Sequence, residues 1–138
     1  MDKDYFTAEL PESEVRALGS LALAHVGDAV FELLVRLHLC SGMGKTNAGL
    51  HQEATRLVNA RAQAEAMQTI LPLLTEEEAD VYRRGRNAKV HSVPKHAETG
   101  DYHAATGLEA LFGWLYLLGR KERLNQLFRA ILEGNDAA

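Results

Sequence analysis

Cysteine and proline are both scarce in this chain of 138 residues, which has one cysteine and three prolines. The single thiol, Cys40, excludes an internal disulfide, and the apolar residues around it predict that it lies in the core. No run of about 18 uncharged apolar residues is present, so no segment is expected to span a membrane. The first residues, MDKD, lack the basic and apolar regions of a signal peptide. Together these absences favour a cytoplasmic protein.

The apolar content is nevertheless sufficient for one hydrophobic core. Apolar residues make up 46% of the chain and charged residues 25%, which is typical of a globular protein and unlike a disordered one. At this length we expect a single domain over residues 1–138, with its core over about residues 14–133.

Helical spacing of the apolar residues dominates the chain, and the alternation typical of strands is absent. The pattern therefore predicts an all-α protein of about six to seven helices. Thr75 followed by Glu78 is the capping-box pattern that begins one of them. Asp101 is expected to cap another, and the tail from Gly134 onward is expected to be frayed. The expected helices cover residues 13–18, 20–39, 46–67, 76–84, 101–119 and 121–132, with an irregular segment over 85–100.

The two expected helices over residues 20–39 and 101–119 are apolar around nearly their whole circumference. Such a helix must be buried on most sides, so we expect a central position or one shared with a second subunit. Each nevertheless carries an acidic residue that does not fit this pattern, Asp28 in the first and Glu109 in the second. Burying an unpaired carboxylate costs roughly several kcal/mol, so each acid must be exposed, paired or bound to a cation.

Small residues flank both acids and let the two helices approach closely, so the carboxylates can converge. Two converging carboxylates without a basic partner suit a hard cation such as Mg²⁺. The alternative is that each acid pairs with an arginine, such as Arg36 or Arg56. The flanking small residues are Gly27, Ala29, Gly107 and Ala110.

Positive charge is concentrated in one segment, although the formal net charge is −4. Five of the 15 lysines and arginines fall within residues 83–96, together with two histidines and no acid. An acidic protein with one basic loop can still contact phosphates, although a solvated basic turn is the favoured interpretation of such a run taken alone. The candidate phosphate-contacting residues are Arg83, Arg84, Arg86, Asn87, Lys89 and Lys95.

Two motifs resemble the ribonuclease III family. Residues 21–32 (LALAHVGDAVFE) resemble its signature helix, which reads around LGDAV, and residues 106–117 (TGLEALFGWLYL) resemble its second acidic helix, EALIGAxYL. Between them, residues 56–59 (RLVN) loosely match an RxxLVN stretch. The resemblance spans about residues 18–124 in the family's order. The pattern LAxxGDAxFE and residues 84–89 (RGRNAK) match the compact Mini-ribonuclease III branch, which lacks a double-stranded-RNA-binding domain.

The resemblance implies a homodimeric ribonuclease III-type catalytic domain that cuts double-stranded RNA. It implies Mg²⁺ as cofactor, with Mn²⁺ as a substitute, and Asp28 and Glu109 as the metal-binding and catalytic residues. Thr106 is expected to act through a water, and His25 and Glu32 are weaker candidates. The implied substrate is 23S ribosomal RNA precursor, with the possible assistance of a ribosomal protein, and the products carry 5′-phosphate and 3′-hydroxyl ends.

Two positions depart from the larger family's pattern, which has four converging carboxylates. Ala24 and Thr106 stand where that pattern places a Glu and an Asp, so two acids remain. These departures keep open a binding module that holds structured RNA without cutting it. A helical protein-interaction module with no RNA role is a third interpretation. His25 is expected to be partly buried with a local hydrogen bond, and Glu32 to be a structural residue.

Overall fold

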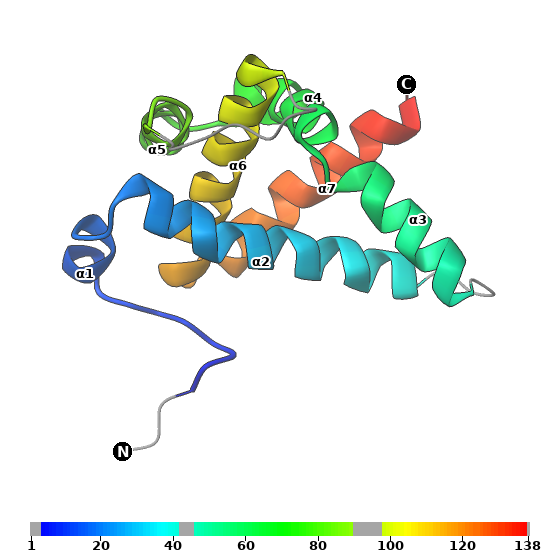
Figure 1. The fold of residues 1–138 in the computed structure, drawn as a ribbon. Helices are drawn as coiled ribbons and strands as arrows, with labels where there is room; N and C mark the ends of the chain where they lie inside the picture. Colours follow the sequence, from blue (N-terminus) through cyan, green and yellow to red (C-terminus); the bar gives the residue numbers. More distant parts are fainter. Residues whose placement is uncertain (1–3, 42–45, 90–97, 138) are drawn as a thin grey trace.

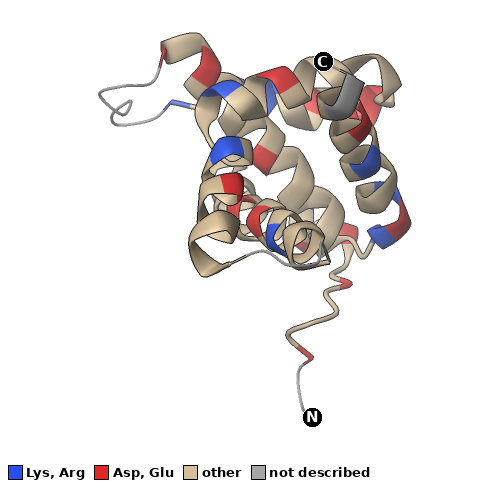
Figure 2. Cartoon of the chain, turned by 90° about the vertical axis from the view of Figure 1, so that its right-hand side faces the viewer, with Lys and Arg blue, Asp and Glu red and all other residues tan. Residues whose placement is uncertain are grey.

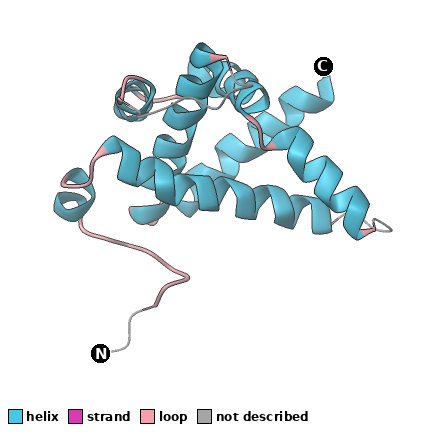
Figure 3. Ribbon diagram, in the orientation of Figure 1, coloured by secondary structure: helices cyan, strands magenta, loops and turns pink. Residues whose placement is uncertain are grey.

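The computed structural model describes residues 4–41, 46–89 and 98–137. These ranges contain seven α-helices and one 3-10 turn and no strand (Figure 3), so the predicted all-helical class is confirmed for them. Among these helices, none is both long and apolar enough to cross a membrane. The elements are α1 (Glu12–Arg16), α2 (Ser20–Cys40), α3 (Asn47–Leu57), α4 (Ala60–Ile70), the 3-10 turn η1 (Leu71–Leu73), α5 (Glu76–Arg86), α6 (Thr99–Leu117) and α7 (Lys121–Ala137).

Helix α6 is the centre of the fold, and α2, α4, α5 and α7 pack around it (Figure 1). Leu108, Leu111, Phe112 and Leu115 on this helix are completely buried. Phe112 meets Phe31 of α2 edge-to-face, with 5.4 Å between ring centroids. Each such side chain contributes about 1.5–3 kcal/mol to folding through burial. The all-round apolar pattern of α6 therefore reflects a central position, as the sequence predicted.

Helix α2 is buried on one side and leaves a leucine-rich face exposed. Leu21, Leu33 and Leu37 have 43%, 64% and 63% of their surface exposed. Helix α2 is therefore not central in the single chain, and the other predicted arrangement, a face shared with a second subunit, stays a prediction. Cys40 also lies at the exposed surface rather than in the core. Its neighbour Leu39 points inward instead, with 4% of its surface exposed.

The segment expected to form one helix over 46–67 forms two. Thr46 caps α3 by accepting a hydrogen bond from the backbone N–H of Gly49 at 3.0 Å. Asn59 then adopts an extended backbone, with φ −149°, and its side chain accepts from the N–H of Ala62 at 2.9 Å. Because the Asn59 side chain caps a new helix, the chain turns here, and α3 and α4 point in different directions (Figure 1).

Two other boundaries also differ from the prediction. Helix α6 begins at Thr99, so Asp101 lies in its first turn and is not its cap. Helix α7 continues through Gly134 to Ala137, so the expected frayed tail is helical. The backbone of Gly134 passes close to Thr69 of α4, and this packing extends the helix beyond the periodic apolar pattern. Gly119, with φ 76°, separates α6 from α7 in the left-handed conformation that glycine adopts most easily.

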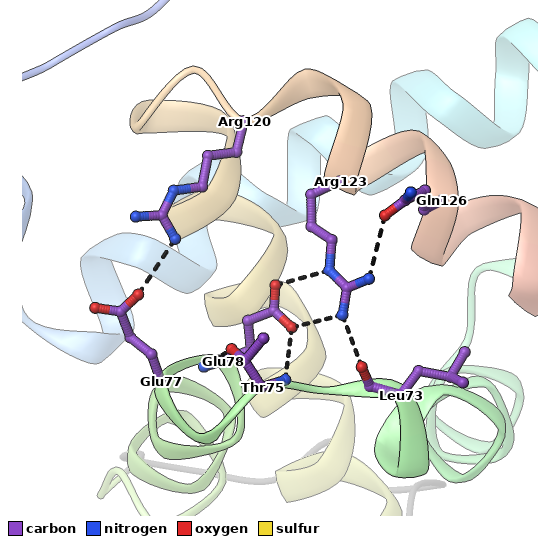
Figure 4. Close-up of polar contacts among 7 residues, drawn as sticks. All are labelled: Leu73, Thr75, Glu77, Glu78, Arg120, Arg123 and Gln126. Carbon is purple, nitrogen blue, oxygen red and sulfur yellow. Dashed lines mark hydrogen bonds and ion pairs between the residues drawn. The ribbon is translucent and has the colours of Figure 1, made fainter.

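The predicted capping box at the start of α5 is present and has a second function (Figure 4). The carboxylate of Glu78 accepts from the backbone N–H of Thr75 and from the guanidinium of Arg123 on α7, each bond measuring 2.8–2.9 Å. Burial alone would raise the pKa of Glu78, but these hydrogen bonds and the charge of Arg123 hold it below its usual value. Arg123 also donates to the carbonyl of Leu73 at 2.7 Å. This ion pair, between a buried carboxylate and a partly exposed guanidinium, thus ties α5 and η1 to α7.

Candidate active site

Helices α2 and α6 cross with their backbones almost in contact. A Cβ added to Gly27 would overlap the carbonyl of Glu109 and lie 2.7 Å from the amide nitrogen of Gly113. A Cβ added to Gly113 would overlap the carbonyl of Leu23. The close approach predicted from small residues is thus present, but Gly113 provides it on α6. Gly107 instead faces Tyr82 of α5, where a Cβ would lie 2.6 Å from the ring.

The crossing brings the carboxyl groups of Asp28 and Glu109 into direct interaction. Asp28 is exposed, whereas Glu109 is partly buried. Burial raises the pKa of Glu109 to about 8, and Asp28 adds to the rise by accepting a hydrogen bond from the protonated form and by repelling the ionised one. Two carboxylates held so close that one retains its proton form a site where a cation would relieve the repulsion.

The arginines considered as alternative partners for these acids pair elsewhere. Arg36 binds Glu32 at 2.8 Å, and Arg56 binds Glu53 at 2.9 Å. Within the described ranges, no group of three or more His, Cys, Asp or Glu residues is placed to hold a metal ion. Any cation at Asp28 and Glu109 would therefore have two protein carboxylates, with water and substrate completing its coordination.

An open cleft of about 1090 Å³ lies between α4 and α6, and Glu109 forms part of its lining. Glu65, Glu98 and Asp101 also line this cleft, whereas Arg61 is its only arginine or lysine among the described residues. Nε of Arg61 lies 3.4 Å from a carboxylate oxygen of Glu65, so the two side chains form an ion pair. The cleft is thus predominantly acidic, which suits a cation better than a bare anion.

Ala24 and Thr106 occupy buried positions close to the crossing. Ala24 lies on α2, one helical turn before Asp28, with 7% of its surface exposed. Thr106, with 6% exposed, lies one turn before Glu109 and lines the cleft. Its hydroxyl donates to the carbonyl of Tyr102 at 3.0 Å, so its oxygen remains able to accept from a water.

The two weaker candidates, His25 and Glu32, both lie on α2. His25 is exposed, so the expectation of a partly buried histidine is wrong. It lies three residues before Asp28, but the crossing with α6 is made by Gly27 and leaves His25 on the open side of the helix. Glu32 forms an exposed i,i+4 ion pair with Arg36, in agreement with a structural role.

Sequence reasoning missed Gln63, which lies on α4 in the lining of the cleft. It is 4% exposed, and its amide acts on Glu109 in the direction that lowers the pKa, opposite to burial and Asp28. The signal was available in the sequence, since a glutamine stands among the small and apolar residues of ARAQAEAM. Arg61 and Glu65 alternate with alanine in the same way, however, so the sequence alone does not distinguish the buried Gln63 from these exposed residues.

The basic residues expected in a loop are largely helical. Arg83, Arg84 and Arg86 form the last turn of α5, which continues through Gly85. Arg83 and Arg84 both pair with Asp80, at 3.6 and 2.5 Å. Figure 2 shows acidic and basic positions intermingled on the helices rather than separated onto two faces.

Other residues of the basic segment follow this turn. The guanidinium of Arg86 lies over the ring of Tyr82, at 5.5 Å. Asn87 is the C-cap of α5, and Lys89 is exposed. Lys95 lies outside the described residues.

Gly85 packs this basic turn against α6 at the level of Glu109, although no residue of α5 lines the cleft. A Cβ on Gly85 would lie 2.7 Å from the Cβ of Ala110 and 3.3 Å from the carbonyl oxygen of Thr106. Helix α5 therefore packs directly on the stretch of α6 that carries Glu109. The glycine that suggested a break in the sequence instead permits this close contact.

Comparison with known proteins agrees with the arrangement of the two acidic helices. Residues 21–120 match the ribonuclease III domain model. A Mini-ribonuclease 3 from Symbiobacterium thermophilum is 49% identical over 114 residues, covering 82% of this chain and 87% of the relative. A Mini-ribonuclease 3 from Enterococcus faecalis is also 49% identical, over 117 residues, with 83% and 88% coverage.

A crystal structure of a protein from Fusobacterium nucleatum superimposes with a TM-score of 0.79 at 30% identity, covering 88% of this chain and 98% of that one. The fold and the paired acids thus define a ribonuclease III domain. The chain belongs to the Mini-ribonuclease 3 branch of that family of endoribonucleases.

Proposed function

We propose that this protein cuts double-stranded RNA at a divalent-metal site formed by Asp28 and Glu109. The observation that carries this proposal is the direct interaction of the two carboxyl groups, with the pKa of Glu109 raised to about 8 by burial and by Asp28. Such a strained acidic pair is costly for folding and is explained by a catalytic role. Membership of an endoribonuclease family provides the reaction class.

The donor set fits Mg²⁺, because both protein ligands are hard carboxylate oxygens and Mg²⁺ retains several waters. Mn²⁺ fits the same ligands. When bound, the ion would lower the pKa of a water and neutralise charge on the scissile phosphate. Asp28 and Glu109 hold that charge in place, and the hydroxyl oxygen of Thr106 accepts a hydrogen bond from a water in the cleft.

The reaction is hydrolysis of one phosphodiester bond. The oxygen of a water adds to phosphorus, the bond from phosphorus to the 3′ oxygen breaks, and the 3′ oxygen takes up a proton. The products carry a 5′-phosphate and a 3′-hydroxyl. The last turn of α5, with Asn87 and Lys89 beyond it, contacts RNA phosphates, as does Lys95. Recognition is by shape and 2′-hydroxyls, since an A-form minor groove is wide and shallow.

The enzyme acts as a homodimer, with the exposed leucine face of α2 covered by the same face of a second copy. Leu33 and Leu37 lie one helical turn apart and are each more than 60% exposed, which is costly in a monomer. A two-fold dimer would place two sites across one duplex, one for each strand. The protein acts in the cytoplasm on 23S ribosomal RNA precursor, with a ribosomal protein as a possible assistant, in line with the family resemblance.

The proposal is tested by comparing substrates. Purified protein is incubated with a long RNA duplex, with each of its single strands and with duplex DNA of the same sequence, in Mg²⁺, in Mn²⁺ and in EDTA. The proposal predicts that only the RNA duplex is cut, and only with metal. Its products should resist 5′ phosphorylation by polynucleotide kinase until a phosphatase has removed the 5′-phosphate, and their 3′-hydroxyls should be ligated without pretreatment. If the protein binds the duplex but cuts neither the duplex nor ribosomal precursor RNA, the proposal is wrong. The protein would then be the binding module that Ala24 and Thr106 leave open.

A further inference from the structure

Gln63 occupies a core position of α4 that an apolar side chain would be expected to fill. The four buried residues of this helix are Gln63, Ala66, Met67 and Ile70, which follow the spacing of one helix face. Only the first is polar. Buried polar groups are nearly always hydrogen-bonded, so an amide in this position requires a partner.

The amide nitrogen of Gln63 has no such partner. Among the residues that the structure describes, its Nε2 makes no well-formed hydrogen bond, although that atom is buried from solvent. The side chain lies in the lining of the cleft, in which Thr106 and Glu109 also take part. A buried N–H without a hydrogen bond indicates a place where an acceptor binds, or toward which a neighbouring acceptor turns.

Glu109 is the acceptor that the surroundings favour. The carbonyl of Tyr102 already accepts from Thr106. Glu65 is two residues from Gln63 on the same helix, so the two side chains point away from each other, and Glu65 is exposed beside Arg61. The Gln63 amide lies close enough to Glu109 to act in the direction that lowers its pKa, although the contact is not a well-formed hydrogen bond.

We propose that Gln63 is a positioning residue that donates its amide N–H to one carboxylate oxygen of Glu109 and so holds the other oxygen toward Asp28. This inference rests on the proposed function, because the geometry matters only if the two acids bind a metal together. The partners of ligating carboxylates tune metal sites strongly, and their loss typically weakens metal affinity or activity by about 10–100-fold.

The test replaces the amide by a thioether of the same length in Gln63→Met. Mn²⁺ binding is measured calorimetrically on the metal-free protein, the Mg²⁺ concentration for half-maximal cleavage is measured on duplex RNA, and stability is followed by thermal unfolding in EDTA. We expect metal affinity to fall and half-saturating Mg²⁺ to rise by about 10-fold or more, without a lower unfolding temperature. Gln68→Met, on the same cleft wall but exposed, is the control and should leave metal affinity unchanged.

Gln63→Asn provides a second variant, because it retains the amide but withdraws it from Glu109, and it should weaken metal binding as well. Unchanged metal affinity in Gln63→Met, with or without a lower unfolding temperature, would show a merely structural role and overturn the inference alone. A wild-type protein that neither binds Mn²⁺ nor cuts RNA would overturn the proposed function and this inference with it.

Discussion

Gly27 of α2 and Gly113 of α6 lie backbone against backbone, so that a Cβ on Gly27 would approach the amide nitrogen of Gly113 to 2.7 Å. Both positions are already glycine, so no smaller residue could bring the two helices closer. The contact brings Asp28 beside Glu109, since Asp28 is the next residue along α2 and the carbonyl of Glu109 is the atom that Gly27 faces. The two glycines therefore set the geometry of the acidic pair.

Gly27→Ala is expected to separate the two helices and weaken both folding and cleavage. The added methyl would overlap backbone, which cannot move aside as a flexible side chain can. Overpacking of this kind costs about 1–3 kcal/mol or more. Gly100→Ala is the control, because no atom lies within 4 Å of a Cβ there and alanine favours a helix. Thermal unfolding should fall only for Gly27→Ala, and equal stability of the two variants would contradict the role of the crossing.

Glu109→Gln is expected to stabilise the metal-free protein at alkaline pH. The pKa of Glu109 is about 8 in the folded protein and 4.5 in the unfolded chain, because burial and Asp28 disfavour its charge. As pH rises from about 4.5 to 8, the unfolded chain releases the proton that the folded protein retains, so stability falls across this window. Glutamine carries no titrating proton, so the variant does not lose stability across this pH window.

In EDTA, the Glu109→Gln variant should therefore be about 1–3 kcal/mol more stable than the wild type at pH 8.5, after allowance for partial exposure, and nearly equal to it at pH 5. Chemical denaturation at the two pH values measures this difference. Glu65→Gln, an exposed acid of the same cleft, should stay within about 0.5 kcal/mol of the wild type throughout. A pH-independent difference for Glu109→Gln would refute the assignment of the buried charge.

Arg84→Ala and Arg86→Ala are each expected to weaken RNA binding and to reduce its salt dependence. Both residues lie on the exposed end of α5 that Gly85 packs against residues 106–110 of α6. Each lost phosphate contact should lower the slope of log affinity against log salt by about one unit or slightly less. Binding of duplex RNA in Ca²⁺ at several salt concentrations measures this slope. Arg129→Ala, on α7, should leave it unchanged, and equal slopes for all three variants would exclude the basic turn as a binding surface.

A double variant, Leu33→Glu with Leu37→Glu, is expected to be a folded monomer. Both side chains are exposed in the single chain, so the charges disrupt the proposed dimer contact and not the core. Sedimentation velocity at micromolar concentration should show dimers for the wild type and for Leu71→Glu, whose leucine is exposed on η1. A monomeric wild type would rule out the dimer at this concentration.

The helical class, the two acidic helices and the capping box at Thr75 could be predicted because each depends on local pattern. The apolar circumference of α6 correctly indicated that this helix is central. Asp28 and Glu109, which interrupt the apolar pattern of their helices, lie close together as expected. Local pattern cannot show which turn of one helix meets which turn of another. For that reason Gly107 was expected at the crossing with α2, whereas it packs on Tyr82 and Gly113 makes the crossing.

The same limit explains the remaining differences. Gly85 resembles a helix breaker in the sequence, and only the neighbouring α6 shows why a glycine is needed inside α5. Asn59 divides a continuous apolar stripe because its side chain caps a helix, which periodicity does not reveal. The leucines exposed on α2 could not be predicted either, because its apolar pattern does not show which of its faces packs on α6.

The central claim, that Asp28 and Glu109 together form a metal-dependent nuclease site, is tested most directly by duplex RNA cleavage across a Mg²⁺ titration. The wild type, Asp28→Asn and Glu109→Gln are compared at equal concentration, after thermal unfolding has confirmed that all three are folded. The account predicts metal-dependent cleavage by the wild type and a loss of at least about 100-fold in each variant, since a two-ligand site does not survive removal of either carboxylate. Cleavage by either variant at the wild-type rate and with the same Mg²⁺ dependence would contradict it.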